Sequence, residues 1–69
     1  MTNEDFAKRV DVHFTMASRM RNGQRLPSVK TLVRISQEFN LPVETLTTAH
    51  SAGPEAFGKL LRERVFEAA

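Results

Sequence analysis

Cysteine is absent from this chain of 69 residues, so neither a disulfide framework nor a thiolate metal site can hold its fold together. The chain has room for one domain, and the apolar core of a domain this small supplies only about 3–5 kcal/mol of stability. Packing of a few short apolar stripes must therefore stabilise the fold. We also expect the chain to associate with a second copy, since oligomerisation is a common support for so small a core.

Apolar residues recur at helical spacing, and no segment of the sequence alternates as a strand does. A first helix is predicted over about residues 3–10, before Asp11, a residue type that tolerates the left-handed backbone of a tight turn. A second helix is predicted over about residues 14–22, because Gly23 just beyond it is a strong stop signal.

Two further helices are predicted in the middle of the chain. Ser28 is a good N-cap for a third helix that Asn40 can end. A short fourth helix is predicted over about residues 42–47, with Val43 and Leu46 facing the core. The buried stripe predicted for the third helix consists of Val29, Leu32, Ile35, Ser36 and Phe39.

The C-terminal part of the chain divides into a linker and a last helix. Residues 49–54 contain Gly, Pro and small polar residues, and are predicted to link a domain at 1–48 to a segment at 55–69. The predicted fold class is therefore all-α, a compact bundle of four short helices plus a C-terminal amphipathic helix. The apolar face of that last helix carries Phe57, Leu60, Leu61 and Val65.

Charge is unevenly distributed along the chain. Acidic residues gather toward both ends, and none lies between Val12 and Gln37. A basic middle of this kind is typical of a face that binds a polyanion, although an ordinary solvated surface gives the same pattern. The basic residues of this stretch are Arg19, Arg21, Arg25, Lys30 and Arg34.

Several classes of protein are not expected from this sequence. No apolar run approaches the ~20 residues needed to cross a bilayer, and the N-terminus lacks the features of a signal peptide, so a cytoplasmic location is expected. His13 and His50 are the only histidines, and no carboxylate or thiol is spaced to share a metal ion with them. No acid–base pair, nucleophile elbow or phosphate loop is present, so we expect no enzyme activity, cofactor, metal or small-molecule substrate.

Small residues occupy the positions where two short helices must cross closely. Ala7 lies on the first predicted helix, Asp11 follows at the turn, and Ala17 packs back from the second helix. With these features, residues 3–46 resemble the lambda-repressor-like (Xre/Cro-type) helix-turn-helix family of bacterial and phage regulators. Further shared features are Gly23 after the second helix, the Leu26-Pro27-Ser28 lead-in, the helix from Leu32 to Phe39 and the segment from Leu41 to Leu46.

The chain departs from the family pattern at four places. Asp11 stands where family members usually have Gly, His13 where they usually have Ser or Thr, and Ala17 where they usually have Ile or Val. The family's first helix is missing before residue 3, yet the segment from Ala56 to Arg64, within the predicted C-terminal helix at 55–69, is similar to it. We expect this segment to fill the first-helix site in its own subunit or in a partner's, to mediate dimerisation, or to begin a second domain.

The resemblance implies contact residues for each part of an interface with DNA. Residues early in the recognition helix reach base edges in the family, and here these are Phe14, Thr15, Ser18 and Arg19. Contacts to the DNA backbone are implied for Asn3, Arg21, Asn22, Arg25 and Lys30. Packing at the first-helix site or at a dimer interface is implied for Phe57, Leu60, Leu61 and Val65. Phe14 also has a second interpretation, as a core residue or a contact to a partner protein.

The resemblance therefore implies a sequence-specific double-stranded DNA-binding transcriptional regulator of Cro or Xre type, and it permits the role of a phage repressor, an excision or lysogeny regulator, or an antitoxin. Residues 1–48 are the expected DNA-binding domain, with a recognition helix at about 14–22 in the major groove. The expected form is a homodimer on a palindromic operator, in a bacterial cell or a phage-infected host. The alternative is a protein-interaction module with the same fold, such as an antitoxin, an anti-repressor or a polymerase-binding regulator, which exposed Phe14 and Met16 would favour.

Overall fold

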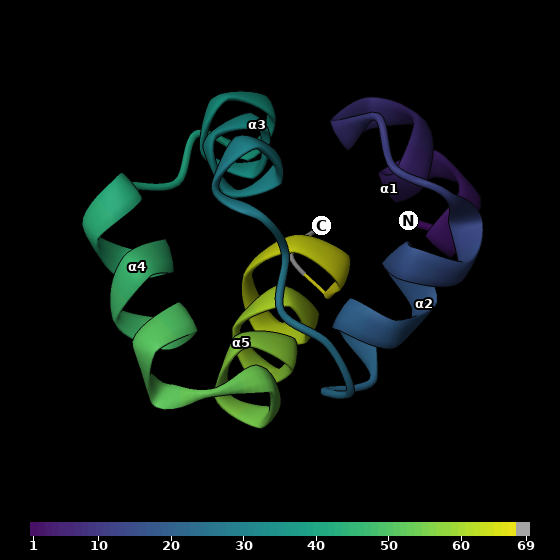
Figure 1. The fold of residues 1–69 in the computed structure, drawn as a ribbon. Helices are drawn as coiled ribbons and strands as arrows, with labels where there is room; N and C mark the ends of the chain where they lie inside the picture. The colour runs from purple at the N-terminus through teal and green to yellow at the C-terminus, as the bar shows by residue number, and fades with distance from the viewer. Residues whose placement is uncertain (68–69) are drawn as a thin grey trace.

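Helix α5 lies in the middle of the fold, between the pair α1 and α2 on one side and α4 on the other, with α3 beside them (Figure 1). The structure is a computed structural model that describes residues 1–67. Within that range all regular structure is helical, as the sequence predicts. The elements are α1 (Asn3–Val10), α2 (Phe14–Arg21), α3 (Val29–Phe39), α4 (Val43–Ala52), α5 (Pro54–Leu61) and the π-helical turn η1 (Arg62–Phe66).

Local capping explains where the first three helices begin. The side chains of Thr2, His13 and Ser28 each accept a hydrogen bond from a backbone N–H two or three residues ahead, at 3.1, 3.0 and 3.3 Å respectively. Each bond satisfies one of the free N–H groups of a first helical turn. The predicted cap Ser28 is confirmed. At α2 the imidazole nitrogen of His13 accepts the capping hydrogen bond, as the hydroxyl oxygens of Thr2 and Ser28 do at α1 and α3.

Two helices end in a residue with left-handed backbone, Asp11 after α1 at φ 58° and Asn40 after α3 at φ 53°. Asp and Asn tolerate this conformation better than other residues that carry a Cβ. The backbone N–H groups of Asp11 and Val12 both point back to the carbonyl of Ala7. This closes the turn that leads into α2, and it confirms the predicted turn at Asp11.

Replacing Asp11 with glycine is expected to raise the free energy of unfolding by about 0.5–1 kcal/mol, since glycine adopts a positive φ without the Cβ penalty. Urea denaturation followed by circular dichroism measures the change. The matched control is Asp11→Ala, which also removes the carboxylate but keeps the Cβ, and which should be less stable than the wild type. Equal stability of the two variants would show that the carboxylate, not the backbone, is what matters there.

One apolar core joins all the helices. Part of it comes from the C-terminal segment, in which Phe57, Leu61, Val65 and Phe66 are buried and Leu60 is partly buried. The other buried hydrophobic residues are Phe6, Ala7, Val10, Ala17, Met20, Leu32, Ile35, Leu41 and Leu46. The segment that the sequence sets apart as a C-terminal helix thus shares its core with the rest of the chain.

The π-helical turn η1 lets two successive residues face this core. Its backbone bond runs from the N–H of Glu67 to the carbonyl of Arg62, five residues back, at 2.8 Å. The wider turn buries Phe66 as well as Val65. The ring of Phe66 lies 5.1 Å from that of Phe6 between centroids. Residues 68–69, the end of the predicted helix at 55–69, lie outside the described residues.

The predicted linker at 49–54 is wrong for every residue except Gly53, since α4 continues to Ala52 and α5 begins at Pro54. Gly53, at φ 112°, separates the two helices. The small polar residues at 49–52 are compatible with a helix, and packing against the rest of the protein stabilises the helical conformation. An imidazole nitrogen of His50 lies 3.0 Å from the carbonyl oxygen of Pro27, and its ring meets the ring of Phe57 edge-on at 6.2 Å. These contacts hold the last turn of α4 against the fold.

Two of the residues predicted to face the core do not. Val29 is 76% exposed and Val43 is 49% exposed, whereas Leu32, Ile35 and Leu46 are buried as predicted. Val29 and Val43 each occupy the first residue of a helix. No further turn of helix precedes the first residue of a helix. A residue there can have the helical spacing of a core residue and still have no neighbouring element to pack against.

Candidate nucleic-acid interface

Helix α2 presents a polar and cationic outer face. Its buried residues, Ala17 and Met20, are one turn apart and define its inner side. The four predicted base-contact residues lie away from that side. Thr15 and Arg19 are exposed, Ser18 is half-buried, and Phe14 is 51% exposed at the first residue of the helix.

The inner side of α2 is held close to α1 by small side chains. Ala7 on α1 and Ala17 on α2 are both buried, and the two helices pack directly against each other. Val12, in the turn between them, is partly buried against the same core. The turn and the two alanines therefore fix the angle at which α2 stands out from the body of the protein.

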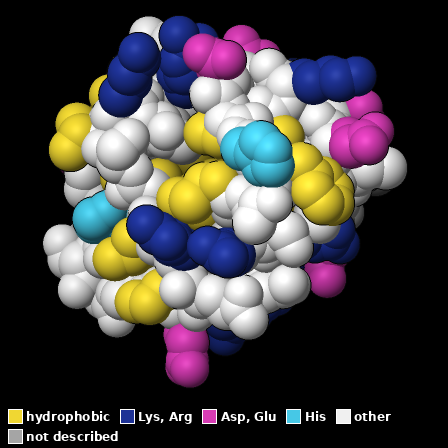
Figure 2. Space-filling model, turned by 45° about the vertical axis from the view of Figure 1, so that its right-hand side comes forward, with side chains coloured by type: hydrophobic (Ala, Val, Ile, Leu, Met, Phe, Trp, Pro, Cys, Tyr) yellow, Lys and Arg dark blue, Asp and Glu magenta, His cyan; other side chains and the backbone are white. Residues whose placement is uncertain are grey.

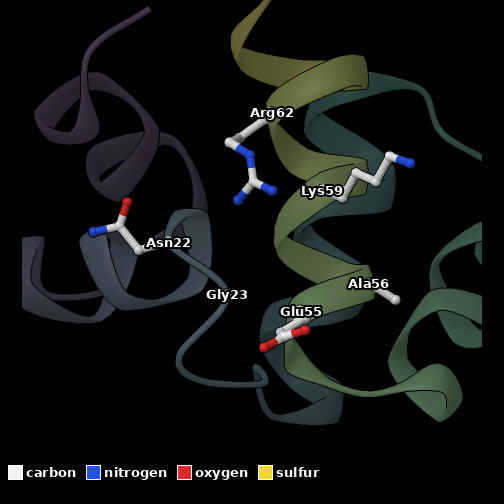
Figure 3. Close-up of a pocket in the computed structure, with 6 residues that line it drawn as sticks. All are labelled: Asn22, Gly23, Glu55, Ala56, Lys59 and Arg62. Atoms are coloured by element: carbon white, nitrogen blue, oxygen red, sulfur yellow. The ribbon is translucent and has the colours of Figure 1, made fainter.

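The other end of α2 is held by α5. A Cβ placed on Gly58 of α5 would come within 2.7 Å of the backbone nitrogen of Gly23, just beyond α2, so the two backbones touch. Arg62 donates a hydrogen bond from Nη1 to the carbonyl oxygen of Arg21. Figure 3 shows this side chain reaching from the end of α5 toward α2, while Lys59 points away from it. An open pocket of about 490 Å³ lies here, lined by Asn22, Gly23, Glu55, Ala56, Lys59 and Arg62.

Two predicted backbone-contact residues are brought together by the fold. Arg21 Nη1 donates a hydrogen bond to Oδ1 of Asn3 at 3.1 Å, and the guanidinium carbon of Arg21 lies 4.3 Å from the centroid of the Phe66 ring. Both Asn3 and Arg21 are half-buried. Arg21 thus ties α2 to the start of α1 and to η1. A contact from either residue to DNA stays a prediction.

The remaining predicted backbone-contact residues are exposed on consecutive parts of the chain. Asn22 caps the end of α2, Arg25 lies in the loop that follows, and Lys30 is in the first turn of α3. Among residues 1–67, no acidic side chain lies within ion-pair distance of Arg19, Arg25 or Lys30. Their charges therefore remain available to a ligand.

The wider charge pattern agrees with an anion-binding face. Figure 2 turns α1 and α2 toward the viewer, and the middle of this face carries basic, histidine and hydrophobic side chains, while Asp and Glu lie toward its rim. Of the five basic residues in the middle of the sequence, Arg34 is the one that pairs with an acid of the described range 1–67, at 4.0 Å from Asp11. Fields of one sign attract ligands of the opposite sign over several ångströms.

Clusters of metal-ligating side chains and long apolar helices are absent from the described part of the chain. No group of three or more His, Cys, Asp or Glu side chains within residues 1–67 is placed to hold a metal ion. None of the helices in that range has the length and apolar character needed to cross a membrane. His13 is occupied as the cap of α2, and His50 bonds to Pro27.

Sequence reasoning missed three residues that position α2: Gly58, Arg62 and Phe66. A signal existed for Gly58, because a lone glycine within an amphipathic helical pattern often marks a close approach of another backbone. No comparable signal exists for Arg62, whose partner is a backbone carbonyl forty-one residues away in sequence. Phe66 lies off the predicted apolar stripe, and the π-helical turn is what directs it inward.

Two short helices joined by a tight turn, with the second one exposed along its outer face, define a helix-turn-helix module. A helix-turn-helix family model matches residues 1–46 of the 69-residue chain. The chain belongs to the lambda-repressor-like (Xre/Cro-type) helix-turn-helix family, whose members are DNA-binding regulators. The predicted resemblance is thereby confirmed. No curated protein and no solved structure matched the chain.

Proposed function

We propose that this protein is a sequence-specific double-stranded DNA-binding transcriptional regulator of Cro or Xre type, with α2 in the major groove. The observation that carries the proposal is the outer face of α2, where Thr15 and Arg19 are exposed while Ala17 and Met20 hold the opposite face in the core. A helix that is anchored on one side and polar on the other fits the width of the major groove.

Each residue of this face has a chemically suitable partner on a base pair. Arg19 can donate two hydrogen bonds to O6 and N7 of a guanine. The hydroxyls of Thr15 and Ser18 can donate to or accept from several base edges, and Phe14 can pack on the methyl group of a thymine. Arg25, Lys30 and Asn22 then set the register of α2 by contacts to phosphates. Asn3 and Arg21 join them at the edge of the interface.

We propose that the C-terminal segment takes the place of the family's first helix within its own chain. Support comes from the packing of α5 against both α2 and α4, and from the burial of Phe57, Leu61 and Val65 in the core. Arg62 and Gly58 contact the end of α2 directly. In this proposal α5 stabilises the position of the recognition helix and does not itself contact DNA.

The functional unit proposed is a homodimer on a palindromic operator, with half-sites about 34 Å apart. A single small module buries roughly 600–1,000 Å² on DNA, which limits its specificity. Two copies related by a two-fold axis read two half-sites at once. Selection of bound DNA from a random pool tests this directly, because a recovered palindrome supports the proposal and a pool without enrichment contradicts it.

An interaction module that binds another protein is the second candidate. The half-exposed ring of Phe14 favours it, whereas Met16 is partly buried against the core and adds little. Gel shift against random DNA at low salt separates the two candidates, since non-specific binding of a basic face is strongest there. Complete absence of a shift would favour the interaction module.

Alanine at Arg25 or at Lys30 is expected to weaken binding to all DNA sequences alike and to reduce the slope of log K against log salt by about one unit each. Fluorescence anisotropy over a salt series, on specific and random duplexes, measures both effects. Lys59→Ala is the matched control, because Lys59 points away from α2 and pairs with Glu63 at 3.9 Å. A loss of slope in the control equal to that in the variants would contradict the assignment.

A further inference from the structure

Arg21, at the end of α2, is half-buried, yet no carboxylate within residues 1–67 pairs with it. The groups that its guanidinium contacts are neutral. They are the amide oxygen of Asn3, at 3.1 Å, and the face of the Phe66 ring, whose centroid lies 4.3 Å from the guanidinium carbon. A guanidinium that is partly removed from water and has only neutral partners keeps an unbalanced positive charge, which favours an anionic ligand.

The turn η1 holds both the backbone and the side chain of Arg21. At the first residue of η1, Arg62 donates a hydrogen bond from Nη1 to the carbonyl oxygen of Arg21. At its last residue, the ring of Phe66 lies against the guanidinium and also packs on the ring of Phe6. Phe66 is only 9% exposed, so its ring is a fixed surface on which the planar guanidinium stacks. The position of Arg21 is therefore set before any ligand binds.

The contact with Arg21 also orients the side chain of Asn3. A guanidinium carries only hydrogen-bond donors, so the amide atom of Asn3 that faces it is the oxygen. The amide nitrogen of Asn3, with its two N–H groups, is thereby left for another acceptor. Arg21 and Asn3 thus form one unit whose remaining polar groups are all donors.

We propose that Phe66 and Arg62 are positioning residues for a contact to a phosphate of the DNA backbone, which they hold ready through Arg21 and Asn3. The inference rests on the proposed function, because it explains how two of the backbone contacts proposed there are made. Donors on a planar guanidinium and on an amide match the oxygens of a phosphate. Side chains that are already fixed lose less conformational entropy on binding. Arg21 therefore binds a phosphate more tightly than an exposed arginine such as Arg25 does.

A titration of the DNA-free protein with inorganic phosphate tests this arrangement. The side-chain nitrogen signals of Arg21 and Asn3 should shift as phosphate is added, and further than the side-chain signal of Arg25, which is exposed and serves as the internal control. Sodium chloride at the same ionic strength controls for screening. Equal shifts at Arg21 and Arg25, or the same shifts with chloride, would show that no site is preformed.

The variant Phe66→Leu keeps an apolar side chain in the core but removes the ring under the guanidinium. It should lower operator affinity by about three- to fivefold, and the same shift of the Arg21 signal should need about three- to fivefold more phosphate. Phe66→Tyr keeps the ring and should stay within about twofold of the wild type in both measurements. Circular dichroism at the assay temperature confirms that both variants are folded. A tyrosine variant as weak as the leucine variant would contradict the role of the ring.

A double-mutant cycle separates positioning from a general effect on the fold. In an Arg21→Met background, Phe66→Leu should change operator affinity by less than about twofold, because no guanidinium is left to position. In an Arg25→Ala background it should keep its full effect. A loss of equal size in both backgrounds would make Phe66 a residue of the fold alone and would overturn the proposal. Failure of the wild type to bind any DNA would count against the proposed function, whereas the phosphate titration would still test the arrangement of Arg21 and Asn3.

Discussion

Replacing Phe57 with alanine is expected to leave most of the protein unfolded at 25 °C. Phe57 is fully buried on α5, among residues of the shared core. Deleting a buried phenylalanine ring usually costs about 3–5 kcal/mol, which is comparable to the whole stability expected of a domain this small. Far-ultraviolet circular dichroism and urea denaturation measure the loss directly.

The control for Phe57→Ala is the same chemical change at Phe14. Because the ring of Phe14 is about half-exposed at the start of α2, Phe14→Ala should alter the free energy of unfolding by only about 0.5 kcal/mol. It should instead weaken binding to the selected operator more than binding to random DNA. Wild-type stability of Phe57→Ala would show that α5 does not belong to the core, and would also remove the basis for placing it at the first-helix site.

Much of the fold could be predicted because the signals are local. A capping hydroxyl at Ser28, a left-handed Asp11 and the Asn22-Gly23 stop are chosen by the backbone within a few residues, so the ends of α1, α2 and α3 follow from the sequence. Stripes at helical spacing also identify most of the core. Both kinds of signal act before any tertiary contact is known.

The predictions from the sequence are wrong where contacts with a distant segment determine the local structure. The polar residues at 49–52 look like a linker, and the packing of His50 against Pro27 and Phe57 keeps them helical. Val29 and Val43 have the spacing of core residues and remain exposed, because no other element within residues 1–67 covers the first residue of α3 or of α4. Helical spacing shows which residues share one face of a helix, but it cannot show whether another element packs against that face.

The candidate site, too, could be predicted from the sequence only in part. The sequence identifies α2 as a helix with few inward apolar residues, and the structure exposes Thr15 and Arg19 on it. The pairing of Arg21 with Asn3 and with Phe66 could not be predicted, since its partners come from opposite ends of the chain. Charge and helical spacing thus predict where the candidate interface lies, while contacts between distant segments determine which of its residues are free.

Replacing Gly58 with alanine should lower the free energy of unfolding by about 2–3 kcal/mol, although the same change in an ordinary helix raises it by nearly 1 kcal/mol. The added Cβ would lie 2.7 and 2.8 Å from the backbone nitrogen and Cα of Gly23 and 3.0 Å from the carbonyl oxygen of Met20. All three atoms belong to the backbone, so no side chain can rotate away. Helix α5 must instead move away from the end of α2.

This movement should reach the proposed DNA interface, since it would lengthen the hydrogen bond from Arg62 to Arg21 and release the end of α2. Operator affinity of Gly58→Ala, measured at a temperature where the variant is still folded, is therefore expected to fall, although residue 58 is buried and cannot touch DNA. Lys59→Ala, at the neighbouring exposed position, should keep both stability and affinity. A Gly58→Ala variant as stable as the wild type, with full affinity, would mean that the two helices do not meet at this glycine and that α5 does not position the recognition helix.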